Sequence, residues 1–269
     1  MGNMRAKLYE IYSLEQLSSG NSVLHALHPS AKLLAAFVYI ACVVSFGRYE
    51  LNRLVPYVFY PVVLAALSST PPGMILKRAL VALPFVLFAG VSNLVFDRAV
   101  MAHLGGLPIS YGAVSLFTLL VRTLLCVAAA LLLVATTPFR FLTGQLRLLR
   151  VPGLVVDLFE MTYRYLGTLL GEATGMHTAY ALRSPVKKGL DMEHMGSFIG
   201  QLLLRSFDRA ERVYAAMKCR GYPGNSREAE KRRFRAADGW FLLLAAGSSL
   251  LFRLADVQGI FVKWLEGVL

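Results

Sequence analysis

The sequence predicts an all-α integral membrane protein with about five transmembrane helices and a cytoplasmic domain of two long crossed helices. Hydrophobic residues make up 56% of the 269 residues, and charged residues make up only 16%. The apolar residues are gathered into blocks that approach the ~20 helical residues needed to cross about 30 Å of hydrocarbon. After Pro138 the pattern changes to amphipathic segments with frequent charges. A large soluble core would disperse both kinds of residue.

Basic charge is concentrated in one region. Between Thr137 and Asp238 lie 17 of the 28 Lys and Arg residues but only 10 of the 16 acidic residues, so this region carries +7 of the net charge of +12. The positive-inside bias predicts that it is cytoplasmic, and no nucleic acid partner is expected. The cluster just before the last apolar run is expected to bind anionic lipid headgroups, with contact to a partner protein as the alternative; it consists of Lys231, Arg232, Arg233 and Arg235.

Four apolar blocks in the first half of the chain predict two membrane hairpins. They cover about residues 31–47, 54–70, 79–96 and 113–137. The first two blocks lie near the lower length limit for a span. A Pro-Pro-Gly turn precedes the third block, and a loop with two glycines precedes the fourth,.

A shorter apolar run at residues 240–252 predicts a fifth span. It reaches bilayer length only if Arg253 and Asp256 lie at an interface or face protein,. An even number of crossings before the basic region places the N-terminus in the cytoplasm. The predicted parts are a cytoplasmic N-terminal segment (1–30), a four-helix transmembrane part (31–137), the cytoplasmic helices (138–238) and a C-terminal transmembrane helix (239–269).

Arg122 is a charged residue inside the fourth block. It lies about nine residues, or about 13 Å, from the start of that block at helical rise. An unpaired cation there costs at least ~2.5 kcal/mol, so the side chain is expected to face protein. It either contacts a membrane partner or acts as a gate, or it bonds to loop carbonyls or to Asn93 or Asp97 of the neighbouring span.

The first long cytoplasmic helix is predicted over residues 153–184. The segment contains no proline, has apolar residues at helical spacing and carries Glu160 and Arg164 at a pairing distance of four residues,. Pro152 and Gly153 begin it and Pro185 ends it,.

Small residues form a stripe on this helix. Gly167, Gly171, Gly175 and Ala179 recur every four residues. Such a stripe allows a second backbone to approach closely, although it can also reflect mere tolerance of glycine. A second helix over about residues 192–220 offers Gly196 and Gly200 as the matching surface. We therefore expect the two long helices to cross at their glycines.

Both long helices end in the same way. The first ends in Leu182-Arg183-Ser184, and the second ends in Cys219-Arg220-Gly221. A basic residue in a last turn is favoured by the helix dipole alone. Because the same ending occurs on two helices, we expect the arginines to bind another protein. A guanidinium is permanently charged, and its forked donors can bind a carboxylate of that protein through two hydrogen bonds.

Signatures of catalysis and of metal binding are missing from the sequence. The five histidines are scattered and no Cys-x-x-Cys pair occurs, so we expect no metal site,. The cysteines are expected to be ordinary packing residues. No phosphate-binding G-x-x-x-x-G-K-[ST] motif and no nucleophile elbow occur. We expect no catalytic residue and no cofactor in this chain, and energy must come from a partner.

The chain resembles the transmembrane coupling (T) components of energy-coupling-factor transporters, the EcfT and CbiQ type, over nearly its whole length. The motifs that carry the resemblance are HPSAKLL at residues 28–34, TTPFRFLTGQLRLLRVP at 136–152, MTYRYL at 161–166, and the arginine-ended AYALRS and ERVYAAMKCRGY. Within the family the opening SGNSVLHALHPSAKLL and the ending MKCRGY are most similar to the cobalt-transport subunit.

The resemblance implies a non-catalytic subunit of a bacterial or archaeal plasma membrane importer. By position, Arg183 and Arg220, with Leu182, Ser184, Cys219 and Gly221 beside them, would enter grooves of two ATPase subunits that bind ATP and Mg. A membrane S component would bind the substrate, which is cobalt or alternatively nickel or a vitamin. The first rival is a stand-alone channel or secondary transporter, which normally needs charged or polar residues at the midplane and often internal repeats, but Arg122 alone qualifies and no repeat is seen,. The second rival is a membrane-embedded enzyme, which the missing acid/base cluster disfavours.

Overall fold

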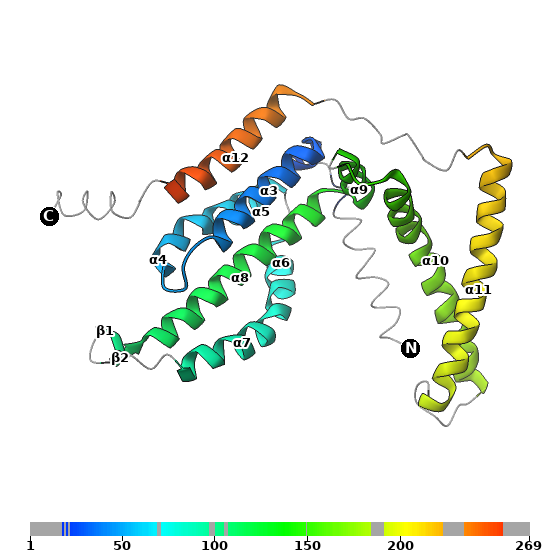
Figure 1. Ribbon diagram of the computed structural model, residues 1–269, viewed down its shortest axis with the longest axis horizontal. Helices are drawn as coiled ribbons and strands as arrows, with labels where there is room; N and C mark the ends of the chain where they lie inside the picture. The colour runs from blue at the N-terminus through cyan, green and yellow to red at the C-terminus, as the bar shows by residue number, and fades with distance from the viewer. Residues whose placement is uncertain are drawn as a thin grey trace. The chain divides into compact units, whose positions relative to one another are not determined.

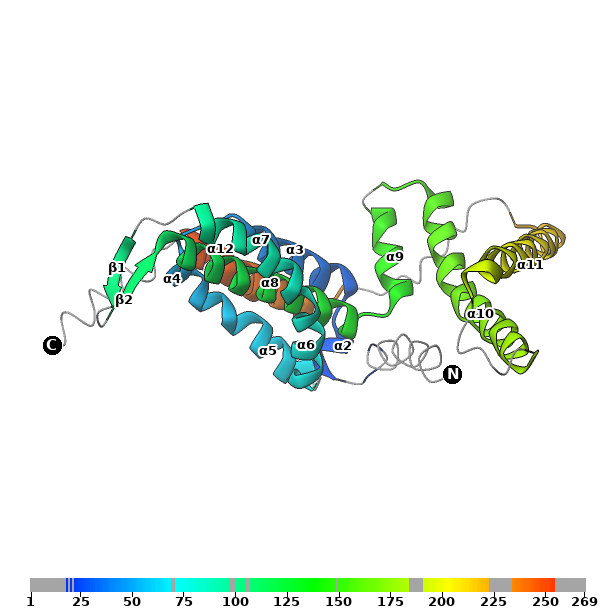
Figure 2. The same cartoon turned by 90° about the horizontal axis from the view of Figure 1, so that it is seen from below.

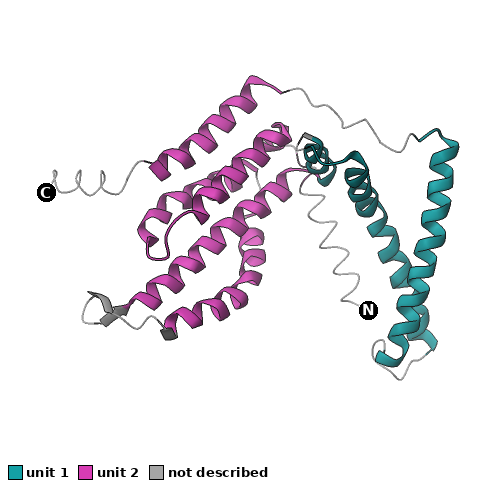
Figure 3. Cartoon of the chain, in the orientation of Figure 1, with its two compact units in different colours: residues 1–16, 139–231 teal, residues 17–138, 232–269 magenta. Residues whose placement is uncertain are grey.

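A computed structural model describes residues 18, 20, 22–68, 71–96, 100–104, 107–148, 150–183, 191–222 and 234–254. The chain divides into two compact units (Figure 3). The span unit consists of residues 17–138 and 232–269, and the helix-pair unit consists of residues 1–16 and 139–231. Almost all of the described chain is helical, which confirms the predicted fold class.

The span unit contains the predicted membrane helices (Figure 1). Its elements are α2 (Val23–Ala26), α3 (Pro29–Val44), α4 (Leu51–Leu54), η1 (Val55–Val58), α5 (Phe59–Ser68), α6 (Pro72–Ala79), η2 (Leu80–Ala82), α7 (Leu83–Phe96), β1 (Val100–Leu104), β2 (Leu107–Ser110), α8 (Tyr111–Thr136) and α12 (Ala236–Leu254). Within the described residues, four helical stretches are long and apolar enough to cross a membrane, namely Leu51–Ser68, Gly73–Leu94, Tyr111–Thr136 and Ala236–Leu254. The apolar α3 has 16 residues and is shorter.

Helix α8 lies at the centre of the span unit. It packs against α7, α3, α5 and α6, while α12 packs along α3 (Figures 1 and 2). Two buried tyrosines link these helices: Tyr39 donates its hydroxyl to the Tyr57 carbonyl at 2.9 Å, and Tyr57 donates to the Ser249 carbonyl at 2.7 Å. Both phenols are therefore satisfied inside an apolar core.

The HPSAKLL motif forms the start of α3. Pro29 occupies the first helical turn, and the His28 ring accepts a hydrogen bond from the Ser30 N–H at 3.2 Å as the cap,. The buried Asp238 carboxylate accepts from the His28 N–H at 2.6 Å and from the Arg235 N–H at 2.7 Å. One carboxylate thus caps α12 and holds it to the start of α3.

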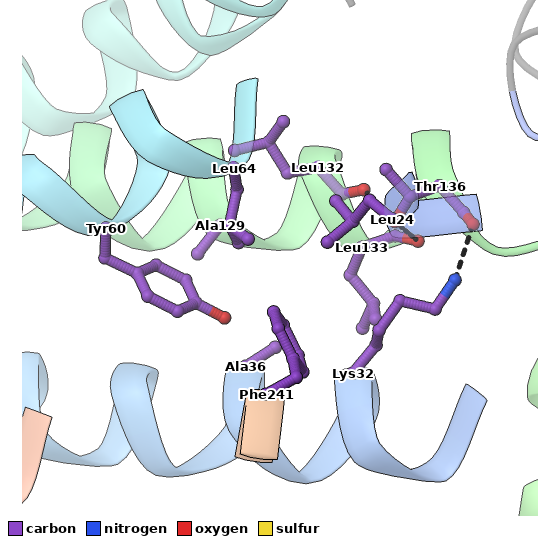
Figure 4. Close-up of a pocket in the computed structure, with 10 residues that line it drawn as sticks. All are labelled: Leu24, Lys32, Ala36, Tyr60, Leu64, Ala129, Leu132, Leu133, Thr136 and Phe241. Carbon is purple, nitrogen blue, oxygen red and sulfur yellow. Dashed lines mark hydrogen bonds between the residues drawn. The ribbon is translucent and has the colours of Figure 1, made fainter. Parts of the chain in front are cut away.

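Lys32 is buried within the span unit. Its ammonium group donates to the Thr136 carbonyl at 2.7 Å, at the end of α8 (Figure 4). A cavity of only about 10 Å³ lies beside it, next to Tyr60 and Leu132. That volume is the minimum for one water molecule, so this cavity does not suit a larger ligand.

Two details of the span unit differ from the prediction. The third span begins earlier, because Pro72 starts α6 where a turn was expected. Proline suits the first helical turn, since its missing N–H has no partner there in any case. The loop before α8 is a short antiparallel hairpin in which Val100 pairs with Ser110 and Leu104 pairs with Leu107.

The described residues of the helix-pair unit form three helices: α9 (Phe139–Leu148), α10 (Gly153–Arg183) and α11 (Met192–Cys219). The two long helices have 31 and 28 residues and follow the predicted bounds closely. Helix α9 packs on the start of α10, where the Phe139 and Tyr163 rings stack with centroids 4.2 Å apart.

Candidate functional site

The long helices α10 and α11 lie antiparallel. Three contacts join them in reverse order along the two helices: Asp157 with Tyr222, Glu172 with Arg209, and Tyr180 with His194. Arg183 and Arg220 therefore lie at opposite ends of the pair. Helix α11 alone, with 28 residues, is about 42 Å long at 1.5 Å per residue,.

Arg220 is presented by a defined helix ending. The Gly221 N–H donates to the Lys218 carbonyl at 3.0 Å, and the Tyr222 N–H donates to the Met217 carbonyl at 3.0 Å. This pattern is the Schellman ending, which requires a left-handed residue after the cap, and Gly221 has a φ of 76°,. Arg220 is exposed, and within the part of the chain that the structure describes its guanidinium has no hydrogen-bond partner.

A buried carboxylate supports this ending. Asp157 is only 3% exposed and accepts from the Arg147 guanidinium at 2.6 Å and from the Tyr222 hydroxyl at 2.7 Å. The network joins α9, the start of α10 and the end of α11. Buried charges in proteins are normally paired in this way. Sequence reasoning missed these three residues, although an acid inside the apolar run Leu154–Phe159 was an available signal.

Arg183 ends α10 and is exposed, and Leu182 before it is 75% exposed. Ser184, the third residue of this predicted group, lies outside the described residues, as do Pro185, Asp97 and the basic residues 231–233. At the other tip, Cys219 is an exposed free cysteine.

The helix pair is not built around its glycines. No heavy atom lies within 4 Å of the position that a Cβ would take at Gly171, Gly175, Gly196 or Gly200, and Gly167 is partly exposed. Contrary to the prediction, α10 and α11 make no close approach at these four glycines, and an ion pair between Glu172 and Arg209 joins the two helices instead.

Glu160 and Arg164 are both described, but they do not form the predicted ion pair. Glu160 instead accepts a hydrogen bond from the Thr143 hydroxyl of α9 at 3.1 Å. This contact adds to the packing of α9 on α10 and leaves Arg164 exposed on the surface of the pair.

The polar residues inside the spans make structural contacts. Arg122 donates to the Phe46 and Gly47 carbonyls, which follow the end of α3. Arg253 donates to the Ser45 carbonyl at 3.3 Å in the same segment, and the Asn93 amide donates to the Ser115 hydroxyl at 3.1 Å. Of the alternatives for Arg122, the structure shows the bond to loop carbonyls.

These features define a class: a multi-pass helical membrane protein with a separate antiparallel helix pair that exposes an arginine at each end. Among the described residues, no group of three His, Cys, Asp or Glu side chains could hold a metal ion.

Comparison with known proteins identifies the family. The family described as cobalt transport protein (CbiQ) matches residues 20–231, and the chain belongs to this family. It is 26% identical over 263 residues to an uncharacterized protein of Methanocaldococcus jannaschii, and the aligned region covers 93% of this chain and 88% of that protein. It is 26% identical over 257 residues to the energy-coupling factor transporter transmembrane protein EcfT of Ruminiclostridium cellulolyticum, covering 89% of this chain and 94% of that one.

A third relative carries a cobalt name. Over 106 residues the chain is 30% identical to the putative fused cobalt transport protein CbiMQ of Methanocorpusculum labreanum, covering 38% of this chain and 17% of that one. Together the matches make this chain a transmembrane component of the EcfT and CbiQ type in energy-coupling factor transporters.

Proposed function

We propose that this chain is the non-catalytic coupling subunit of an importer for cobalt ions, and that it transmits movements of two ATPase subunits to a substrate-binding S component. The observation that carries the proposal is the placement of Arg183 and Arg220 at opposite ends of one antiparallel helix pair. A rigid element of about 42 Å with a cation at each end can touch two separate subunits at once.

The chemistry of each tip suits an acidic groove. A guanidinium offers donors in a planar fork that binds a carboxylate through two hydrogen bonds and retains its charge at any physiological pH. Arg220 has a glycine cap that fixes the end of its helix. ATP binding and hydrolysis in the partners would move these tips, and the helix pair would carry the movement to the spans.

The membrane orientation belongs to the proposal. We count the shorter apolar α3 as a span together with the three longer apolar stretches before α9, which gives four crossings. Placing the basic residues of the helix-pair unit in the cytoplasm then puts the N-terminus on the same side. The ATPase subunits would then meet the arginine tips in the compartment that contains ATP.

Cobalt is the proposed substrate because of the family description and the CbiMQ name. We assign recognition of the ion to the S component rather than to this chain. Transition metals are held by several His, Cys or carboxylate groups together, and the described residues do not bring such groups together,.

The test is the double variant Arg183→Ala with Arg220→Ala, expressed together with the ATPase and S subunits. We expect normal membrane insertion, loss of ATPase co-purification and loss of cobalt uptake. The matched control is Arg205→Ala with Arg212→Ala, which removes two exposed charges from the side of α11. This control should retain both ATPase co-purification and cobalt uptake. Normal assembly and uptake in the tip variant would refute the assigned role.

A further inference from the structure

A cavity of about 170 Å³ lies between α10 and α11 at the end that carries Arg220. Its lining includes Met161, Arg164 and Tyr165 from α10 and Val213, Met217 and Arg220 from α11. For comparison, a cavity of about 150 Å³ in a protein core can hold one benzene molecule. This space is therefore large enough for one amino-acid side chain.

The lining combines apolar walls with two cations. Methionine, valine and tyrosine side chains supply the walls, and Arg164 and Arg220 supply the charge. The acidic groups nearest in sequence are already engaged, since Glu160 accepts from Thr143 and Asp157 accepts from Arg147 and Tyr222. Within the described chain neither of the two guanidiniums has a carboxylate partner.

The position of the cavity is held by the buried network described above. Asp157 binds Tyr222, which follows directly after the ending of α11, so this end of α11 stays against α10. The cavity is thus a feature of a fixed helix ending rather than of a loose one. Preformed sites of this kind bind with a smaller entropic cost.

We propose that this cavity receives a glutamate-like side chain of the ATPase subunit that docks on Arg220, with Arg164 as the second cation that binds its carboxylate. The inference rests on the proposed docking of Arg220. The methylene groups of the entering side chain would pack against Met161 and Met217, and its carboxylate would lie between the two guanidiniums. Two charge-assisted contacts to one carboxylate give both affinity and a fixed orientation.

The experiment measures the affinity of purified ATPase subunits for the full chain in lipid nanodiscs. Arg164→Ala should weaken binding about tenfold, because a hydrogen bond to a charged group is lost. Arg164→Lys keeps the charge but not the fork, so it should bind with intermediate affinity. Arg205→Ala is the matched control, since Arg205 is exposed on α11 but does not line the cavity.

A second variant tests the cavity without changing any charge. Ala216 also lines the space, so Ala216→Phe should fill it and weaken binding to a similar extent. Arg164 is exposed, so its variants should fold normally. They therefore test whether the cavity binds the ATPase side chain even if Ala216→Phe does not fold.

The outcomes separate this inference from the docking function. Wild-type affinity in Arg164→Ala, with loss of binding in the Arg183 and Arg220 double variant, would overturn the cavity inference alone. Wild-type affinity in the double variant as well would overturn both. Weaker binding that is restored in part by Arg164→Lys would support the inference.

Discussion

Tyr222 donates its hydroxyl hydrogen bond to the buried carboxylate of Asp157, 65 residues earlier, at 2.7 Å. The bond fastens the end of α11 to the start of α10, and the same carboxylate also binds Arg147 of α9. Arg220 lies two residues before Tyr222, so the position of this tip depends on a contact that Arg220 itself does not make.

The first prediction concerns this support. Tyr222→Phe removes the hydroxyl but keeps the ring and keeps Arg220, leaving Asp157 with one partner fewer. We expect the free energy of unfolding to fall by about 1.5–3 kcal/mol, because a hydrogen bond to a charged group is lost. Thermal unfolding measures this change.

The same variant has a consequence for docking. ATPase affinity should fall less than in Arg220→Ala, because the guanidinium remains but its end of the helix is less fixed. Tyr214→Phe is the control, since Tyr214 is exposed on α11. If Tyr222→Phe unfolds at the wild-type temperature, the bond to Asp157 does not support the tip.

The second prediction compares two glycines of α11. Gly221 has a φ of 76°, and a side chain there costs about 1–2 kcal/mol in a left-handed conformation,. Gly221→Ala should therefore lower the unfolding temperature. Gly196→Ala, in a helical position with open space around it, should raise it because alanine favours a helix by about 1 kcal/mol over glycine,.

A different result at Gly196 would also be informative. Destabilisation by Gly196→Ala or by Gly200→Ala would show that another backbone approaches these positions, as the glycine stripe originally predicted. That outcome in the assembled complex, but not in the isolated chain, would place the close approach at a partner.

The third prediction concerns Asp238, which is 3% exposed and accepts from the His28 and Arg235 N–H groups. Asp238→Ala leaves both donors without this acceptor and removes a helix cap. We expect a loss of about 2–4 kcal/mol, the sum of a cap and a buried hydrogen bond. Glu50→Ala is the control, because the exposed pair of Glu50 with Arg53 should contribute about 0–1 kcal/mol,.

The fourth prediction tests the role of Arg122. Arg122→Met removes its bonds to the Phe46 and Gly47 carbonyls, so the segment after α3 should be held less firmly and the unfolding temperature should fall. The alternative role as a gate predicts another pattern. Altered cobalt uptake in a variant that unfolds at the wild-type temperature would favour the gate.

Local patterns determined much of the fold in advance. The apolar blocks became helices, and α10 and α11 begin and end within a residue or so of the predicted bounds. Helix formation depends on neighbours three or four residues apart, and proline and glycine mark the ends. Such information is present in a short window of sequence.

Contacts between distant residues could not be predicted in the same way. The sequence suggested that glycines would bring α10 and α11 together, whereas the described contacts use Asp157 with Tyr222 and Glu172 with Arg209. The prediction was wrong at Gly171, Gly175, Gly196 and Gly200, because a small residue permits a close approach but does not require one,.

The sequence by itself determined the class of protein, the bounds of the long helices and the two arginines that end them. Only the tertiary structure decided that these arginines lie at opposite ends of an antiparallel pair, that a cavity with Arg164 adjoins one of them, and that Asp238 joins α12 to a residue 210 positions earlier. The reason is physical: helices arise from short-range hydrogen bonds, while their pairing depends on which buried polar groups find partners far along the chain.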